Sequence, residues 1–237
     1  GFGGHGEQVA DNFVVHGRAG ADSDPLSGCG ITELSWISGF RSLQTLNLSG
    51  NQISDEGLSV EKTTVKELNL SQNVITSFVL TNGWAGVENL NLSENQLTSF
   101  SVEVSEGDCA LTVLNLASNK IDSFNLGAAK KTVSLNLSGN NLSGLTLSSD
   151  SLLSLSLSEN PLAGLTLNLP NLASLEVSCN TTYPNGIVWN LPALKLLDMS
   201  KEFHCSSDIL KNLPQLETLS VHLSGVSVES VAALNSV

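Results

Sequence analysis

The stretch VENLNLSENQLTSFSV, residues 87–102, holds one complete unit of a pattern that runs through most of the chain. Leu90 and Leu92 are two positions apart, with Asn91 between them. Because side chains alternate between the two faces of a strand, both leucines point inward and Asn91 points outward. Asn95 marks a bend, because an asparagine side chain can hydrogen-bond to backbone groups of its own turn. Apolar residues then recur at Leu97, Phe100 and Val102. Their spacing predicts a second short β-segment on the other side of the coil.

The same unit recurs along the chain at intervals of 20 to 24 residues. Seven copies end on an asparagine, from LQTLNLSGN at Asn51 to LASLEVSCN at Asn180, and two degenerate copies end at Glu202 and Ser224. Such regular repetition predicts a solenoid, in which each coil buries its apolar face against its neighbours. The asparagines are expected to stack as an internal ladder. They are Asn51, Asn73, Asn95, Asn119, Asn140, Asn160 and Asn180.

The pattern L-x-x-L-x-L-x-x-N resembles that of leucine-rich repeat proteins over roughly residues 40–237. The resemblance implies a right-handed solenoid with a concave parallel sheet. We expect a mainly β fold, with a second short β-row on the convex side and few or no helices. Phe78, Phe100 and Phe124 should stack inside the coils. The expected organisation is a Gly-rich flexible lead-in over 1–24, an N-terminal cap over 25–42, and about nine coils over 43–237 with an uncapped C-terminal edge.

Composition and charge argue against several classes of partner. The formal net charge is −13 and the ten Lys and Arg residues are scattered, whereas nucleic-acid binding needs clustered cations. No apolar run reaches the roughly 20 residues that a membrane span requires. Charged residues make up only 14% of the chain, and Ser, Asn and Gly fill the polar positions. This surface favours an extracellular protein.

Catalytic and metal-binding signatures are missing from the sequence. The four histidines stand at positions 5, 16, 204 and 222, and no nucleophile, phosphate-binding or zinc motif accompanies them. His5 and His16 lie in a Gly-rich segment without further ligands. We therefore expect no enzyme activity, no cofactor and no metal.

The outward positions of the concave strands are the candidate binding surface. One row reads Asn47, Asn69, Asn91, Asn115, Asn136, Ser156, Glu176, Asp198 and Ser220. Its uniformity favours hydrogen-bonding ladders between neighbouring strands. Flanking positions vary more and are mildly acidic, which suits a basic protein partner. The candidate partner-binding residues are Lys66, Glu67, Glu88, Asn89, Glu94, Thr112, Glu176, Lys195, Asp198 and His222.

Cysteines and glycosylation sequons are the remaining features of an extracellular chain. Cys179 and Cys205 fall at nearly equivalent positions of consecutive coils, so they are the favoured disulfide. Cys29 and Cys109 would pair only if the N-terminal segment drapes back along the solenoid. Among the N-x-S/T sites, Asn141 is the best glycosylation candidate because it lies just outside the ladder.

The leading functional hypothesis is an extracellular recognition module, because the chain resembles receptor ectodomains and internalin-type adhesins built from leucine-rich repeats. The alternative is a structural subunit of an extracellular fibre or matrix. Such a subunit would self-associate through the open C-terminal edge, which exposes apolar surface unless it is covered.

Overall fold

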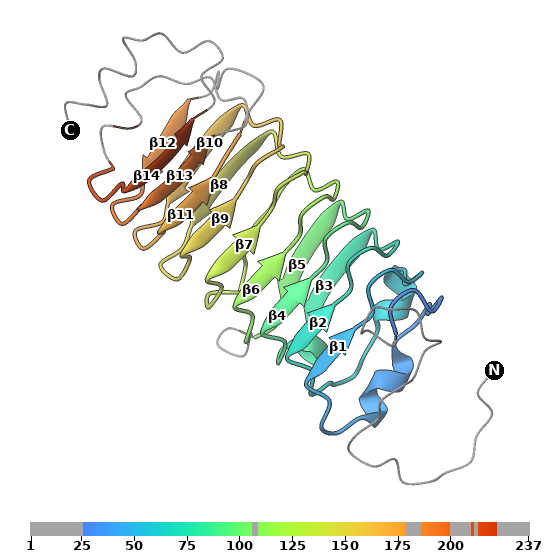
Figure 1. Cartoon of the computed structure of the whole chain (residues 1–237). Coiled ribbons are helices and arrows are strands. Elements are labelled where there is room, and N and C mark those ends of the chain that lie inside the picture. Colours follow the sequence, from blue (N-terminus) through green and yellow to red (C-terminus); the bar gives the residue numbers. More distant parts are fainter. Residues whose placement is uncertain (1–25, 106–108, 179–185, 200–209, 211–212, 222–237) are drawn as a thin grey trace, which may run out of the picture.

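The computed structural model describes residues 26–105, 109–178, 186–199, 210 and 213–221. In this part of the chain, nine short parallel strands form one continuous sheet along the solenoid, one from each repeat (Figure 1). In spatial order they are β1 (Thr45–Asn47), β2 (Glu67–Asn69), β4 (Asn89–Asn91), β6 (Val113–Asn115), β7 (Ser134–Asn136), β9 (Ser154–Ser156), β11 (Ser174–Glu176), β13 (Leu196–Met199) and β14 (Thr218–Val221). The expected concave parallel sheet is confirmed.

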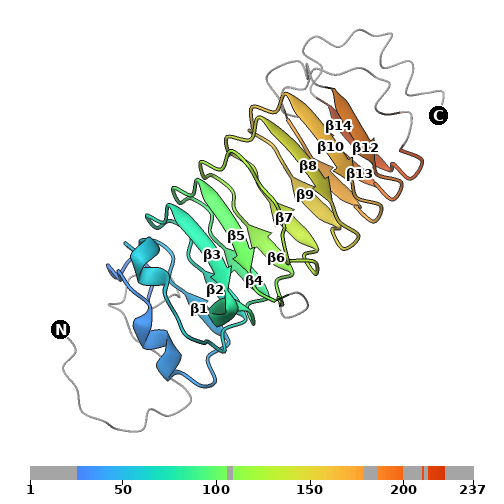
Figure 2. The same cartoon turned by 180° about the vertical axis from the view of Figure 1, so that it is seen from behind.

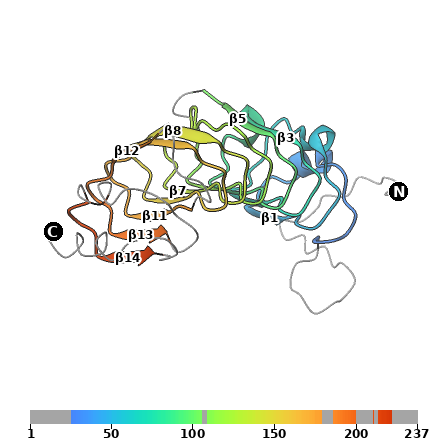
Figure 3. The ribbon, with the colours of Figure 1, turned by 90° about the horizontal axis from the view of Figure 1, so that it is seen from above.

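A second β layer lies on the opposite side of the coils (Figure 3). It consists of β3 (Ser77–Thr81) paired with β5 (Ser99–Glu103), and of β8 (Gly144–Ser148), β10 (Gly164–Asn168) and β12 (Ile187–Asn190). The expected convex β-row is thus confirmed, but it is interrupted at the coil between β5 and β8. There Asn125 Oδ1 accepts the backbone N–H of Gly127 at 2.7 Å, and Gly127 has a φ of 54°. This turn ends the extended run early.

The core between the two layers is almost entirely aliphatic, and it runs the length of the solenoid. The two inward leucines of each of the first six repeats are buried, as the alternating burial of the strands requires. The expected phenylalanine stack is confirmed: the ring centroids of Phe78 and Phe100 are 6.1 Å apart, and those of Phe100 and Phe124 are 6.3 Å apart. This stack lies beneath the convex layer, which faces the viewer in Figure 2.

Three 3-10 helices occur in the described residues: η1 (Ser35–Gly39), η2 (Asp55–Leu58) and η3 (Asn82–Trp84). The segment that holds η1 packs against the first coil. Leu34 and Ile37 are fully buried there, and the Leu34 N–H donates to the carbonyl of Gly57 at 2.9 Å. Residues 26–40 therefore cover the N-terminal end of the core. The predicted lead-in over 1–24 and the last residues at the C-terminal edge lie outside the described residues.

Each ladder asparagine makes four hydrogen bonds, two within its own coil and two to the preceding coil. Asn95 shows the pattern: its Nδ2 donates to the carbonyls of Leu70, Leu92 and Ser93, and its Oδ1 accepts the N–H of Ile75 at 3.1 Å. The same four contacts recur at Asn51, Asn73, Asn119, Asn140 and Asn160. Asn180 lies outside the described residues. All six described members are buried, so each satisfies backbone groups that water cannot reach.

Asp55, the first residue of η2, binds the backbone that leads into β3. Its Oδ1 accepts the N–H groups of Thr76 at 2.6 Å and Ser77 at 3.1 Å, and its Oδ2 accepts the Thr76 hydroxyl at 2.6 Å. Partial burial raises the pKa of the Asp55 carboxyl, but these hydrogen bonds favour the ionised form and outweigh it. The pKa of Asp55 is therefore lower than its ordinary value of 3.8.

The lowered pKa predicts an acid-dependent loss of stability at Asp55. Because the folded-state pKa is below the unfolded one, the ionised carboxylate stabilises the fold fully above about pH 4, and this contribution is lost as the pH falls through the lowered value. Between about pH 5 and pH 2 the wild type should lose more stability than Asp55→Asn, which has no carboxyl to protonate. Thermal unfolding midpoints of both proteins across this range measure the difference. Parallel curves would contradict the prediction.

Candidate protein-binding face

The asparagine row on the concave sheet bonds within each coil. The Oδ1 atoms of this row accept the backbone N–H two residues further along the same coil, at 3.0 to 3.1 Å. The residues are Asn47, Asn69, Asn91, Asn115 and Asn136. In these five coils these side-chain bonds form a local turn instead of the expected ladder between neighbouring strands. Further along the row, the Ser156 hydroxyl donates to Glu176 on the neighbouring strand at 2.9 Å, as the ladder predicts.

In Asn69, Asn91 and Asn115 the side-chain oxygen accepts this local bond, and the amide NH₂ is the donor group of the same side chain. A shallow depression of about 550 Å³ lies over β1, β2, β4 and β6. Its polar lining includes Asn69, Asn91 and Asn115. Glu67 is the one ionisable side chain among the residues that line it, and its Oε2 accepts the Thr45 hydroxyl at 3.2 Å. The depression thus combines amide donors with one carboxylate.

Five predicted binding residues gather around this depression. Lys66 Nζ forms an ion pair with Glu88 Oε1 at 2.8 Å, so these two charges largely cancel. The Thr112 hydroxyl donates to the carbonyl of Glu88 at 3.0 Å, and Asn89 lines the depression beside Glu67. Glu94 follows β4 at the turn, where its carboxylate accepts from Gln72 Nε2 at 3.1 Å. The structure therefore brings Lys66, Glu67, Glu88, Asn89 and Thr112 together.

The other predicted residues lie in the C-terminal half of the sheet. Glu176 on β11 accepts the hydroxyl groups of Ser156 and Ser158, both at 2.9 Å. Asp198 on β13 is its partner in strand register. Lys195 pairs with Glu217 at 3.0 Å. These residues are separated from the first group by β7 and β9, so the prediction describes two groups. His222 lies outside the described residues.

Three exposed apolar side chains on this side of the molecule were not predicted from the sequence. Val113, Leu153 and Leu196 are 38%, 48% and 39% exposed. Val113 and Leu196 stand in one strand register row, and Leu153 precedes β9. The signal was present in the sequence, because the position before each strand is polar or charged in the first four repeats and apolar in the next three.

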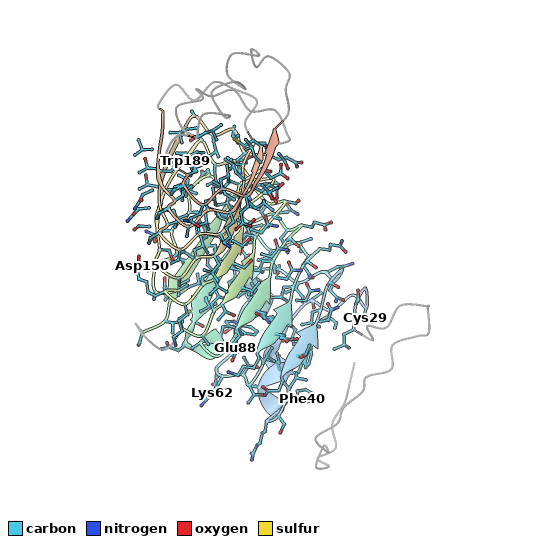
Figure 4. All side chains as sticks on the ribbon, turned by 60° about the vertical axis from the view of Figure 1, so that its left-hand side comes forward. Cys29, Phe40, Lys62, Glu88, Asp150 and Trp189 are labelled. Carbon is cyan, nitrogen blue, oxygen red and sulfur yellow. The ribbon has the colours of Figure 1, made fainter. Side chains whose placement is uncertain are left out.

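The described residues include two of the four cysteines and the glycosylation candidate. Cys29 is exposed and Cys109 is buried. Cys179 and Cys205, the favoured disulfide, lie outside the described residues. Asn141 is exposed beside the buried Asn140. Figure 4 shows Cys29 near the N-terminal end of the molecule.

The described residues also bear on metal binding and on membrane insertion. They contain no group of three or more His, Cys, Asp or Glu side chains arranged to hold a metal ion. Their helices are all too short or too polar to cross a membrane.

Comparisons with known proteins concern the repeat and the fold of the chain. Residues 41–60 and 61–77 match a family model described as Leucine Rich repeat, and the concave sheet contains nine strands in the described residues. The chain therefore contains leucine-rich repeats and folds as a leucine-rich repeat solenoid. The match covers two of its repeats, and no curated protein sequence matches the chain.

One solved structure with a TM-score above 0.5 supports the leucine-rich repeat fold. The leucine-rich repeat domain of APL1B is similar with a TM-score of 0.57 and 19% identity, covering 80% of this chain and 60% of that one. The functional domain of InlJ from Listeria monocytogenes has a TM-score of 0.47 and 17% identity, with 84% and 54% covered. A TLR13–ssRNA13 complex has a TM-score of 0.47 and 22% identity, with 89% and 40% covered. This leucine-rich repeat solenoid thus spans 60% or less of the length of each.

Proposed function

We propose that this leucine-rich repeat solenoid is an extracellular recognition module, a receptor ectodomain or a surface adhesin, that binds a protein partner through its concave face. Solenoids of this kind generally bind proteins on an extended concave surface. The observation that carries the proposal is the depression over β1, β2, β4 and β6, which is lined by asparagine side chains and by the Glu67 carboxylate. Such a lining suits backbone carbonyls and a basic side chain of a protein ligand.

Charge supports the same kind of partner. The chain has a formal net charge of −13, and the ion pair of Lys66 with Glu88 leaves Glu67 as the uncompensated charge of the depression. A basic partner would be attracted over long range and then oriented by Glu67. Mutation of this carboxylate should therefore slow association and weaken binding.

Composition supports the extracellular part of the proposal. Only 14% of the residues are charged, and Asn, Ser and Thr occupy many of the solvent positions of the strands. Asn141 adds an exposed N-x-S site. Immunodetection of the native protein in the medium or on the cell surface tests this part. Detection in the cytosol alone would contradict it.

Binding is tested by capturing proteins from the secreted and cell-surface fractions of the source on three immobilised chains. They are the wild type, Glu67→Lys, and Thr166→Lys as a matched control on the convex strand β10, where Thr166 is exposed. We expect mass spectrometry to find proteins that the wild type and Thr166→Lys retain and that Glu67→Lys loses about tenfold or more. Equal retention by all three chains would overturn the concave site.

A further inference from the structure

A continuous row of residues, here called the rim row, precedes the strands of the concave sheet. Each of its carbonyls from Gln44 to Lys195 accepts two N–H groups from the next coil; the Gln44 carbonyl, for example, accepts the N–H of Lys66 at 2.7 Å and of Glu67 at 2.9 Å. The rim row consists of Gln44, Lys66, Glu88, Thr112, Val133, Leu153, Ala173, Lys195 and Glu217. At a strand spacing of about 4.8 Å, the stretch from Lys66 to Glu217 is about 34 Å long.

The rim row has charges at both ends and apolar side chains in the middle. Lys66 pairs with Glu88 near one end, and Lys195 pairs with Glu217 at the other. Leu153, which is 48% exposed, lies at the centre beside the half-buried Val133. Figure 4 shows Glu88 near the N-terminal end of this flank, and Asp150, three residues before Leu153, further along it. An exposed apolar patch with a charged border is typical of a protein interface.

The order of the charges makes the rim row complementary to a second rim row that runs in the opposite direction. From a centre between Val133 and Leu153, Glu88 and Lys195 are equally distant and opposite in sign. Lys66 and Glu217 lie one coil further out on each side, and they are again opposite in sign. A two-fold interface requires that a surface match itself after such a reversal. A parallel copy in the same register would instead place each charge against its like.

We propose that a second copy of this chain docks antiparallel along the rim row, with the two-fold axis between Val133 and Leu153. Lys66 then faces the partner's Glu217, and Glu88 faces the partner's Lys195. Each intrachain ion pair thereby becomes half of a cluster of four alternating charges. The apolar centre, where Val133 meets the partner's Leu153, loses its contact with water.

Local neutrality is a further reason why two copies meet here. The chain as a whole has a formal net charge of −13, which repels a second copy. The rim row contains two lysines and two glutamates, so its formal charge is zero. Two rim rows therefore approach each other without the repulsion that other surfaces of the chain produce. This inference goes beyond the proposed function, since it requires no other protein.

Charge swaps test the arrangement while they keep every intrachain ion pair and the net charge. The first swap is Lys66→Glu with Glu88→Lys, and the second is Lys195→Glu with Glu217→Lys. Sedimentation equilibrium of the wild type should show a dimer. Each swap alone places like charges opposite each other, so its dimer dissociation constant should rise about tenfold or more. Both swaps in one chain restore the pairing, and so does an equimolar mixture of the two swapped chains.

A matched pair of substitutions tests the apolar centre. Leu153→Ser should weaken the dimer about tenfold, because the buried contact is lost. Val74→Ser is the control, since Val74 is 42% exposed and lies outside the rim row. Its dimer should be unchanged. A wild type that stays monomeric, a dimer that persists in either swap alone, or an equal effect of the two serine variants overturns the proposal.

Discussion

Replacement of Phe100 by alanine is expected to destabilise the solenoid by about 3–5 kcal/mol. The Phe100 side chain is 6% exposed and lies in the middle of the aromatic stack. Its ring is nearly parallel to that of Phe78, with an interplanar angle of 6° and a centroid distance of 6.1 Å, and Phe124 covers its other side at 6.3 Å. Alanine leaves a cavity between two rings that belong to neighbouring coils and can only partly close it.

Urea unfolding, followed by circular dichroism, measures this loss for Phe100→Ala beside Phe100→Leu. Leucine keeps most of the apolar burial and should cost only about 1–2 kcal/mol. The gap between the two variants separates the cavity from the loss of the aromatic ring. If alanine cost less than about 1 kcal/mol, the stack would contribute little to the stability of the fold.

Replacement of Asn140 by alanine is expected to cost about 2–4 kcal/mol, although it removes only a small polar group. Asn140 Nδ2 donates to the carbonyls of Leu116, Leu137 and Ser138, and its Oδ1 accepts the Ile121 N–H at 3.0 Å. Alanine leaves these backbone groups without that side-chain partner in a site that is 4% exposed. Each buried group left unsatisfied costs about 1–3 kcal/mol.

Asn141→Ala is the matched control, because it changes the same residue type one position along the chain. Asn141 is exposed, and its described bond to the Lys120 carbonyl is 3.5 Å long. Its removal should change the free energy of unfolding by about 0.5 kcal/mol or less. Urea titrations of the two variants give the comparison. Similar losses at the two positions would argue against a structural role for the ladder.

Most of the fold could be predicted from the sequence, because its strands and its core depend on the spacing of apolar residues in the repeat. The inward leucines and the phenylalanine stack follow once the repeat fixes which residue lies above which. The break in the convex layer could not be predicted in this way. The coil with Phe124 has the same apolar spacing as its neighbours, and a turn between Asn125 and Gly127 prevents a strand there. That turn depends on one side-chain hydrogen bond, which the repeat pattern does not contain.

The positions of the residues in the candidate site could be predicted from the sequence, but their hydrogen bonds and ion pairs could not. The alternation of strands places Glu67 and Asn89 on the concave face. Whether Asn69 bonds to the next strand or to its own coil depends on which N–H lies within reach, and the structure has the local bond. The pairing of Lys66 with Glu88 requires two residues 22 positions apart to be neighbours. Such neighbours emerge only when the coils are placed in register.

The break in the convex layer has a mechanical consequence. In a solenoid, stiffness is transmitted from each coil to the next by the contacts between them. Backbone hydrogen bonds on the convex side join β3 to β5, and β8 to β10 and β12, while the coil with Asn125 interrupts this series. At that coil the described concave sheet is continuous and the convex layer has a gap, so strand pairing joins the neighbouring coils on the concave side alone. Bending of the molecule should therefore concentrate at residues 121–127, which divide the solenoid into two stiffer arms.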